Sequence, residues 1–170
     1  MRGTLASLAA WLLVCAMAAT VRADKPLLPT MQRDLNVVAF WSITCVPCKA
    51  ELALFEALYQ KYKADANVRV LAVNIDPVRD APAARKMAAA LKLTMPVVTG
   101  GDAIYERLFG GDLSIPRLAV FDRNNAGLER NGALGGEKAE SFVRDVSAAL
   151  ESVRAGVPKA PTMQWAAIKH

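Results

Sequence analysis

Residues 37–49 read Val-Val-Ala-Phe-Trp-Ser-Ile-Thr-Cys-Val-Pro-Cys-Lys, and this stretch decides the fold. Its first five residues form a continuous apolar run that is short enough for a fully buried strand. From Pro47 to about Lys63, apolar side chains recur at steps of three and four residues, which predicts a helix. The apolar stripe of this helix consists of Cys48, Leu52, Phe55, Tyr59 and Tyr62. The sequence therefore predicts two cysteines at the start of a helix that follows a buried strand.

The two cysteines differ in their predicted surroundings. Cys45 falls at the helix N-terminus, where unpaired N–H groups and the helix dipole favour a thiolate. We therefore expect Cys45 to be the attacking sulfur. Cys48 lies in the first turn on the apolar face, which suits a resolving thiol that attacks a mixed disulfide from the inside. Pro47 between them costs no hydrogen bond, because its missing N–H would be unpaired at this position.

Glu51 is a third candidate for the site. It follows Cys48 by three residues, so it lies about 60° away around the helix axis and flanks the apolar stripe. A partly buried carboxylate at this position could accept the proton of Cys48 as the internal attack begins. The alternative is a surface glutamate that snorkels or pairs with a lysine. Position alone leaves both interpretations open.

The first 23 residues have the pattern of an export signal. Arg2 supplies the positive start, and the stretch Leu5–Val21 carries no charge and is followed by small residues. We expect cleavage after Ala23, with cleavage after Ala18 as a second choice. An uncleaved membrane anchor is the alternative, because this run of 17 residues is at the lower limit for spanning a bilayer.

Composition and cysteine count exclude several classes of function. The 170 residues, 54% of them apolar and 22% charged, fit one globular domain. Without Arg2 and Arg22 of the signal, 19 basic residues oppose 16 acidic ones, and a net charge of +3 is too small to indicate nucleic-acid binding. His170 is the sole histidine, which argues against a closed zinc site and against Cys-His hydrolysis. We expect no metal and no cofactor.

The remainder of the sequence alternates between predicted strands and helices. We expect strands at Val68–Ile75, Pro96–Val98, Arg117–Phe121 and Leu128–Ala133, and helices at Ala83–Leu91, Ala103–Leu108 and Glu137–Val153. This order predicts an α/β domain over residues 24–154 with a hairpin near its end. Residues 155–170 form a predicted tail, in which Trp165 has no assigned role beyond covering apolar surface.

Three motifs together resemble the thioredoxin fold. They are the strand that ends in Phe40-Trp41, the Cys45-Val46-Pro47-Cys48-Lys49 sequence that opens a helix, and Ile115-Pro116 before a strand. This resemblance implies a three-layer α/β/α architecture around a central mixed sheet. Glu51 and an extra helical segment between Ile75 and Pro96 are similar to the exported TlpA/ResA group. Members of that group are reducing thiol-disulfide oxidoreductases that often serve cytochrome maturation.

The resemblance also assigns roles within the site. It implies that Cys45 is the nucleophile, that Cys48 is the resolving thiol, and that the two form the redox-active disulfide. Pro116 matches the cis-proline that packs against this disulfide, and Ile115 would offer backbone groups to an extended substrate. Trp41 and Pro47 are structural residues near the site. Glu51 has a precedent as a functional carboxylate in the group.

The sequence departs from the family pattern at three places. Thr44 stands where the family usually has a tryptophan before the first cysteine. Ala39 replaces the buried aspartate or asparagine of the strand, which leaves Glu51 as the nearby carboxylate. The 13 residues between Ala23 and Val37 are too few for the N-terminal hairpin that these proteins commonly carry.

Our leading hypothesis is a periplasmic protein-disulfide reductase. It would reduce cysteine pairs in other exported proteins, for cytochrome c or oxidase assembly, and would receive electrons from a membrane thiol carrier. An oxidising or isomerising enzyme of the same fold is the first alternative. A second alternative is a module that binds Cu(I) through its two soft sulfurs. The direction of electron flow depends on the reduction potential, which the sequence does not determine.

Overall fold

The computed structural model describes residues 33–124, 126–131, 138–156 and 165–168. The predicted export signal, residues 1–23, lies outside the described residues, and so does the stretch 157–164 of the predicted tail. Among the helices of the described ranges, none has both the length and the apolar character needed to cross a membrane.

Within the described ranges, a mixed six-stranded sheet forms the centre of the domain, in the order β3-β2-β1-β4-β5-β6. The central strand β1, Leu35–Trp41, pairs in parallel with β2, Val68–Asn74, and antiparallel with β4, Arg117–Asp122. The outer strands are β3 (Val97–Val98), β5 (Gly127–Asn131) and β6 (Ala166–Ala167). Both the predicted alternation of elements and the hairpin, formed by β4 and β5, are present.

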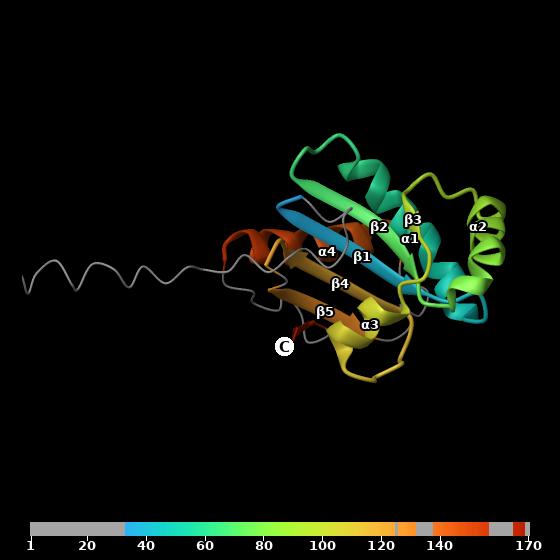
Figure 1. The fold of residues 1–170 in the computed structure, drawn as a ribbon. Coiled ribbons are helices and arrows are strands. Elements are labelled where there is room, and N and C mark those ends of the chain that lie inside the picture. The colour runs from blue at the N-terminus through green and yellow to red at the C-terminus, as the bar shows by residue number, and fades with distance from the viewer. Residues whose placement is uncertain (1–32, 125, 132–137, 157–164, 169–170) are drawn as a thin grey trace, which may run out of the picture.

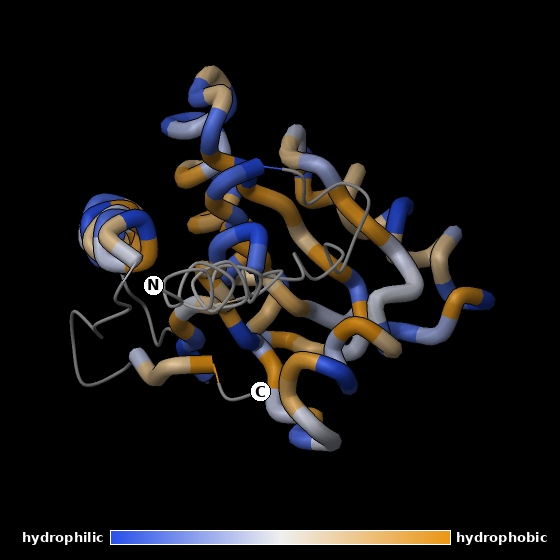
Figure 2. The backbone as a smooth tube through the Cα atoms, turned by 60° about the vertical axis from the view of Figure 1, so that its left-hand side comes forward, coloured by the Kyte–Doolittle hydropathy of each residue, from blue (hydrophilic) through white to orange (hydrophobic). Residues whose placement is uncertain are grey.

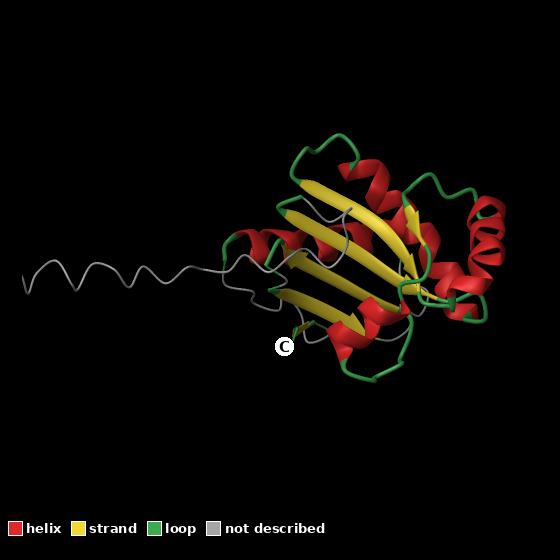
Figure 3. Cartoon of the chain, in the orientation of Figure 1, coloured by secondary structure: helices red, strands yellow, loops and turns green. Residues whose placement is uncertain are grey.

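Helices cover both faces of this sheet, as Figures 1 and 3 show. The helices α1, Val46–Tyr62, and α4, Ala139–Arg154, pack on one face, and α3, Asp102–Phe109, lies on the other. A single 3-10 turn, Val78–Asp80, and the helix α2, Ala81–Ala90, form the predicted helical insertion between β2 and β3. The thioredoxin-like three-layer architecture is therefore confirmed.

Strand β1 is apolar on both of its sides because both sides face a hydrophobic core. Val37, Ala39 and Trp41 belong to the core beneath α1 and α4. Val38 and Phe40 belong to the core beneath α3, where the ring of Phe40 packs edge-on against that of Tyr105. The central strands are accordingly hydrophobic along much of their length in Figure 2. This double burial explains the continuous apolar run in the sequence.

The observed ends of β1 and α1 differ slightly from the predicted ones. β1 begins at Leu35, two residues before the apolar run, because Leu35 and Asn36 already pair with β2. Asn36 is fully buried, and its amide donates to the carbonyl of Arg33 at 3.3 Å. Hydropathy does not predict a polar side chain at a fully buried strand position. α1 begins at Val46, one residue before the predicted start.

The C-terminal residues 165–168 are part of the sheet. β6 pairs antiparallel with β5, and Trp165, which is 4% exposed, joins the core beneath α4. The indole Nε1 of Trp165 donates to the carboxylate of Asp145 at 2.8 Å. Two paired residues and one buried aromatic ring form too short a pattern to show periodicity, so the sequence does not predict this strand.

Candidate active site

Cys45 and Cys48 lie where β1 has ended and α1 begins. Cys45 occupies the N-cap position of α1, and its Sγ accepts the backbone N–H of Cys48 at 3.2 Å. The two residues form a disulfide, with their Cα atoms 5.3 Å apart. Cys48 is 1% exposed, whereas Cys45 is only partly buried. The structure thus presents one sulfur to solvent and encloses the other.

Ile115 and Pro116 lie at the same end of the sheet as the disulfide. The peptide bond between them is cis, Pro116 is buried, and Ile115 packs against both hydrophobic cores. In the register of β1 and β4, Arg117 pairs with Phe40, five residues before Cys45. The residue that precedes Arg117 is therefore next to the end of β1, from which the chain leads to the cysteines.

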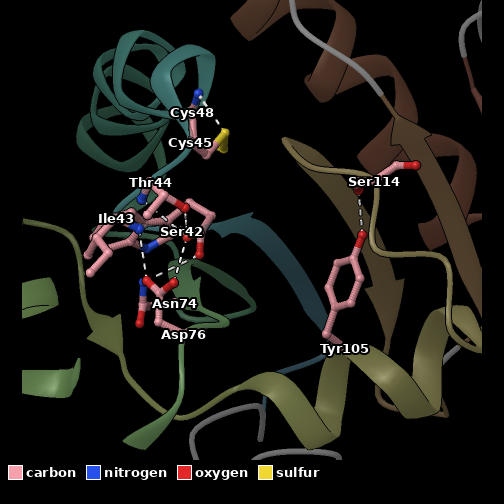
Figure 4. Close-up of a disulfide and its surroundings, with 10 residues drawn as sticks. Ser42, Ile43, Thr44, Cys45, Cys48, Asn74, Asp76, Tyr105 and Ser114 are labelled. Carbon is pink, nitrogen blue, oxygen red and sulfur yellow. Dashed lines mark hydrogen bonds between the residues drawn. A yellow bond between two sulfur atoms is a disulfide. The ribbon is translucent and has the colours of Figure 1, made fainter. Parts of the chain in front are cut away.

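A carboxylate that follows the neighbouring strand β2 holds the loop before Cys45. Asp76, two residues after β2, accepts the backbone N–H of Ile43 at 2.8 Å and the hydroxyl of Ser42 at 2.5 Å. The amide of Asn74 donates to the same carboxylate at 2.6 Å. Figure 4 shows residues 42–44 lying between the disulfide and this acidic side chain. Asp76 therefore ties the segment that leads to Cys45 to the end of β2.

Comparison with known proteins identifies the family. Residues 28–133, more than half of the chain, match the Redoxin family. The chain belongs to the Redoxin family. No curated protein sequence matches it.

Solved structures agree with this assignment. A candidate thiol:disulfide interchange protein DsbE from Chlorobium tepidum is 25% identical, with a TM-score of 0.58 over 71% of this chain and 83% of that one. StoA from Bacillus subtilis is 23% identical, with a TM-score of 0.52 over 65% of this chain and 81% of StoA. A secreted Mycobacterium tuberculosis disulfide oxidoreductase is 18% identical, with a TM-score of 0.53 over 70% and 84% of the two chains. The resemblance to thioredoxin-fold, TlpA/ResA-like proteins is confirmed, and this Redoxin-family chain is a thiol-disulfide oxidoreductase.

Glu51 is a buried carboxylate in this Redoxin-family chain. It is 7% exposed and lies one helical turn after Cys48, so it is not a surface residue. Ala39, on the strand beneath α1, is also buried. A side chain without a proton-accepting group therefore occupies the position where the resemblance led us to expect an acid or amide. Whether Glu51 transfers protons stays a prediction.

Of the two residues predicted to be structural, Trp41 and Pro47, only the first is buried. Trp41 is 1% exposed within the core that includes Cys48, whereas Pro47 is exposed in the first turn of α1. Thr44, which replaces the expected tryptophan, is exposed. Its hydroxyl shares a hydrogen bond of 3.0 Å with the hydroxyl of Ser42. A small polar side chain thus borders the disulfide on this side.

Asp76 is not among the site residues predicted from the sequence. The signal that could have found it is its position directly after a buried strand that runs parallel to β1. Because the carboxyl ends of parallel strands meet at one edge of a sheet, polar residues after β2 lie close to the loop after β1. The residues Asn74 and Asp76 follow this rule.

Proposed function

We propose that this enzyme is exported and reduces disulfides in other exported proteins. The observation that carries the proposal is the unequal exposure of the two sulfurs at the N-terminus of α1. Cys45, partly exposed at the N-cap, is suited to attack a large substrate, and Cys48, 1% exposed, is suited to resolve the product. Substrates of a thiol-disulfide oxidoreductase of this family are proteins that carry cysteines.

The reaction is a pair of thiol-disulfide exchanges. The Cys45 thiolate attacks one sulfur of the substrate disulfide, a mixed disulfide forms, and the other substrate sulfur leaves as a thiolate that takes up a proton. Cys48 then loses its proton and attacks the sulfur of Cys45. The mixed disulfide breaks, the second substrate thiol is released, and the enzyme disulfide forms. Two electrons have passed from the enzyme to the substrate, and the observed disulfide corresponds to the oxidised product.

Glu51 is the proposed acceptor of the proton that Cys48 loses. Its burial one helical turn from Cys48 supports this role, because a base must be within reach of an enclosed thiol. Ile115 and Pro116 are the proposed substrate-binding residues. The position of Ile115 beside the end of β1 supports the binding of an extended substrate segment through its backbone groups.

Export and electron supply complete the proposal. The export pattern of residues 1–23 and the secreted Mycobacterium tuberculosis relative support a periplasmic location. We propose a mature domain over residues 24–154, with an uncleaved anchor as the alternative to cleavage. Each turnover leaves an oxidised enzyme, so a reductant must return two electrons, and we propose a membrane thiol carrier as that reductant. Assembly of cytochrome c or of an oxidase is the proposed destination of the reduced thiols.

A redox titration of the purified protein tests the direction of electron flow. We expect a reduction potential nearer to about −270 mV, typical of thioredoxin, than to about −120 mV, typical of a strong oxidant. A value above about −180 mV would favour the oxidising or isomerising alternative. Alkylation of the reduced protein tests the roles of the cysteines, since Cys45 should react first. Preferential labelling of Cys48 would exchange the two assignments.

A further inference from the structure

A second loop borders the site, and its attachment differs from that of the loop before Cys45. Residues 110–116, called here the proline loop, connect α3 to β4 and end at the cis peptide bond. The residues 110–114 are exposed, so the hydrophobic cores do not hold this part of the loop. Polar side chains from the two flanking elements hold it instead.

Arg117, the first residue of β4, holds the middle of the proline loop. Its guanidinium forms an ion pair with the carboxylate of Asp112, and Nη1 lies 3.5 Å from the Asp112 carbonyl. The side chain of Arg117 is 3% exposed, and its guanidinium lies 4.2 Å from the ring centroid of Phe109. The carboxylate of Glu129 forms a second ion pair, with its Oε2 3.3 Å from Nε of Arg117. This contact does not have hydrogen-bond geometry. The guanidinium is thus confined by an aromatic ring and two carboxylates, which fixes where Asp112 can lie.

Tyr105 on α3 holds the loop closer to the cis bond. Its hydroxyl donates to the carbonyl of Ser114, the residue before Ile115, at 2.5 Å. Figure 4 shows this bond reaching the loop from the helix below it. Tyr105 is 1% exposed, and burial raises the pKa of its hydroxyl to about 12, so the group remains a donor across the physiological pH range. Ser114 in turn donates its backbone N–H to Asp112 at 2.9 Å, which joins the two attachments.

We propose that Arg117 and Tyr105 are positioning residues that hold the proline loop so that the backbone of Ile115 meets an extended substrate segment in a fixed geometry. This inference rests on the proposed function, which assigns substrate binding to Ile115 and Pro116. Neither side chain is proposed to touch substrate or sulfur. Their effect is on substrate affinity, because a loop that is already ordered loses less conformational entropy when a partner strand pairs with it.

The test compares a peptide substrate with a small disulfide. A flexible peptide closed by one internal disulfide can pair with the Ile115 backbone, whereas cystamine contains no peptide group and cannot. Tyr105→Phe should raise KM for the peptide roughly two- to tenfold, the loss expected for one hydrogen bond, and leave kcat within about twofold. Turnover of cystamine and the alkylation rate of Cys45 should stay at the wild-type values.

Arg117→Lys should have the same signature, since lysine keeps the charge but loses the planar fork. Asp112→Asn allows a double-mutant cycle. If Arg117 acts through Asp112, the double variant should raise KM for the peptide no further than Arg117→Lys alone.

Matched control variants remove similar interactions elsewhere in the protein. Tyr62→Phe loses a hydroxyl bond of 2.8 Å to Ser147, and Arg130→Lys alters an ion pair of 2.9 Å with Asp145. Both controls should leave KM for the peptide unchanged.

The possible outcomes separate this inference from the proposed function. Unchanged peptide KM in both Tyr105→Phe and Arg117→Lys would overturn the positioning role while leaving reductase activity intact. Equal losses on peptide and cystamine would also overturn it, because they would indicate general damage to the site. A wild-type enzyme that reduces neither substrate would instead overturn the proposed function. Tyr105→Phe is the milder variant and keeps the test decisive where Arg117→Lys does not fold.

Discussion

Two loops lie at the end of the sheet that carries the disulfide, and they are held by hydrogen bonds of opposite direction. In the cysteine loop, residues 42–45, a backbone N–H and a hydroxyl donate to the carboxylate of Asp76. In the proline loop, a carboxylate and two carbonyl groups accept from Arg117 and Tyr105. The first loop is held by an acceptor that follows a neighbouring strand, and the second by donors on the elements that flank it.

This difference separates two aspects of the reaction. Asp76 fixes the attacking sulfur relative to the sheet, so its loss should act on the rate of exchange. Arg117 and Tyr105 fix the surface on which a substrate segment would lie, so their loss should act on affinity. The comparison therefore predicts that variants of the cysteine loop change kcat, whereas variants of the proline loop change KM. Four experiments challenge or refine this division.

The largest effect is expected on the cysteine side, from Glu51→Gln. Glutamine keeps the shape but cannot accept the proton of Cys48, so resolution of the mixed disulfide should slow. Loss of a general base typically costs about 10²- to 10⁴-fold, and less where water can substitute. The mixed disulfide should accumulate in rapid-quench experiments, while the alkylation rate of Cys45 changes little. Glu56→Gln is the matched control on the same helix, because Glu56 accepts the backbone N–H of Thr94 at 2.8 Å, away from the cysteines. Unchanged resolution in Glu51→Gln would leave Glu51 a structural residue.

Asp76→Ala should produce the next largest effect. It leaves the donors of Ser42, Ile43 and Asn74 without their acceptor, at a cost of about 1–3 kcal/mol for each group that water cannot reach. We expect denaturant titration to show a free energy of unfolding that is lower by roughly 2–4 kcal/mol. The value of kcat should fall while KM for the peptide stays the same. A rise in KM without a change in kcat would contradict the division between the loops. Asp65→Ala, which removes an exposed turn bond of 2.8 Å to Asn67, serves as control.

Leu113→Ser should have a smaller effect, confined to the proline side. Leu113 is 71% exposed between the two held residues Asp112 and Ser114, so its replacement should hardly change the stability of the fold. If a substrate segment covers this side chain, the lost apolar contact should raise KM for the peptide about two- to fivefold. Leu91→Ser, at the end of α2, should leave KM unchanged. An effect on kcat alone would show that the proline loop also influences the exchange step.

The smallest effect concerns pH. Hydrogen bonds from Ser114, together with Arg117, lower the pKa of Asp112 from 3.8 to about 2. A lowered folded-state pKa means that the contribution of Asp112 to stability is complete above the unfolded value and is lost as the pH falls through about 2. The difference in denaturation midpoint between wild type and Asp112→Asn should therefore be constant above about pH 4, shrink as the pH falls and vanish below about pH 2. A difference that vanishes already at pH 4–5 would show that this attachment of the proline loop is not formed in solution.

Local features of the sequence determined the centre of the site. A strand buried on both faces must be apolar throughout, so the run 37–41 could be recognised as β1 without a structure. A helix that packs one face must repeat its apolar residues at steps of three and four, which placed Cys45 at the N-terminus of α1 and Cys48 on its buried face. These patterns lie within about 25 consecutive residues, so chain geometry alone relates them.

Only the tertiary structure decided what surrounds that centre. Asp76 is 33 residues from Ile43, and Trp165 is 20 residues from Asp145, yet each pair is joined by a hydrogen bond. Arg117 and Asp112 are close in sequence, but the aromatic ring and Glu129 that confine the guanidinium come from α3 and β5. Polar contacts of this kind have no periodicity, because their partners are set by the register of the sheet and by the packing of helices upon it. Hydropathy identifies what is buried, and the folded arrangement of strands determines which polar groups meet.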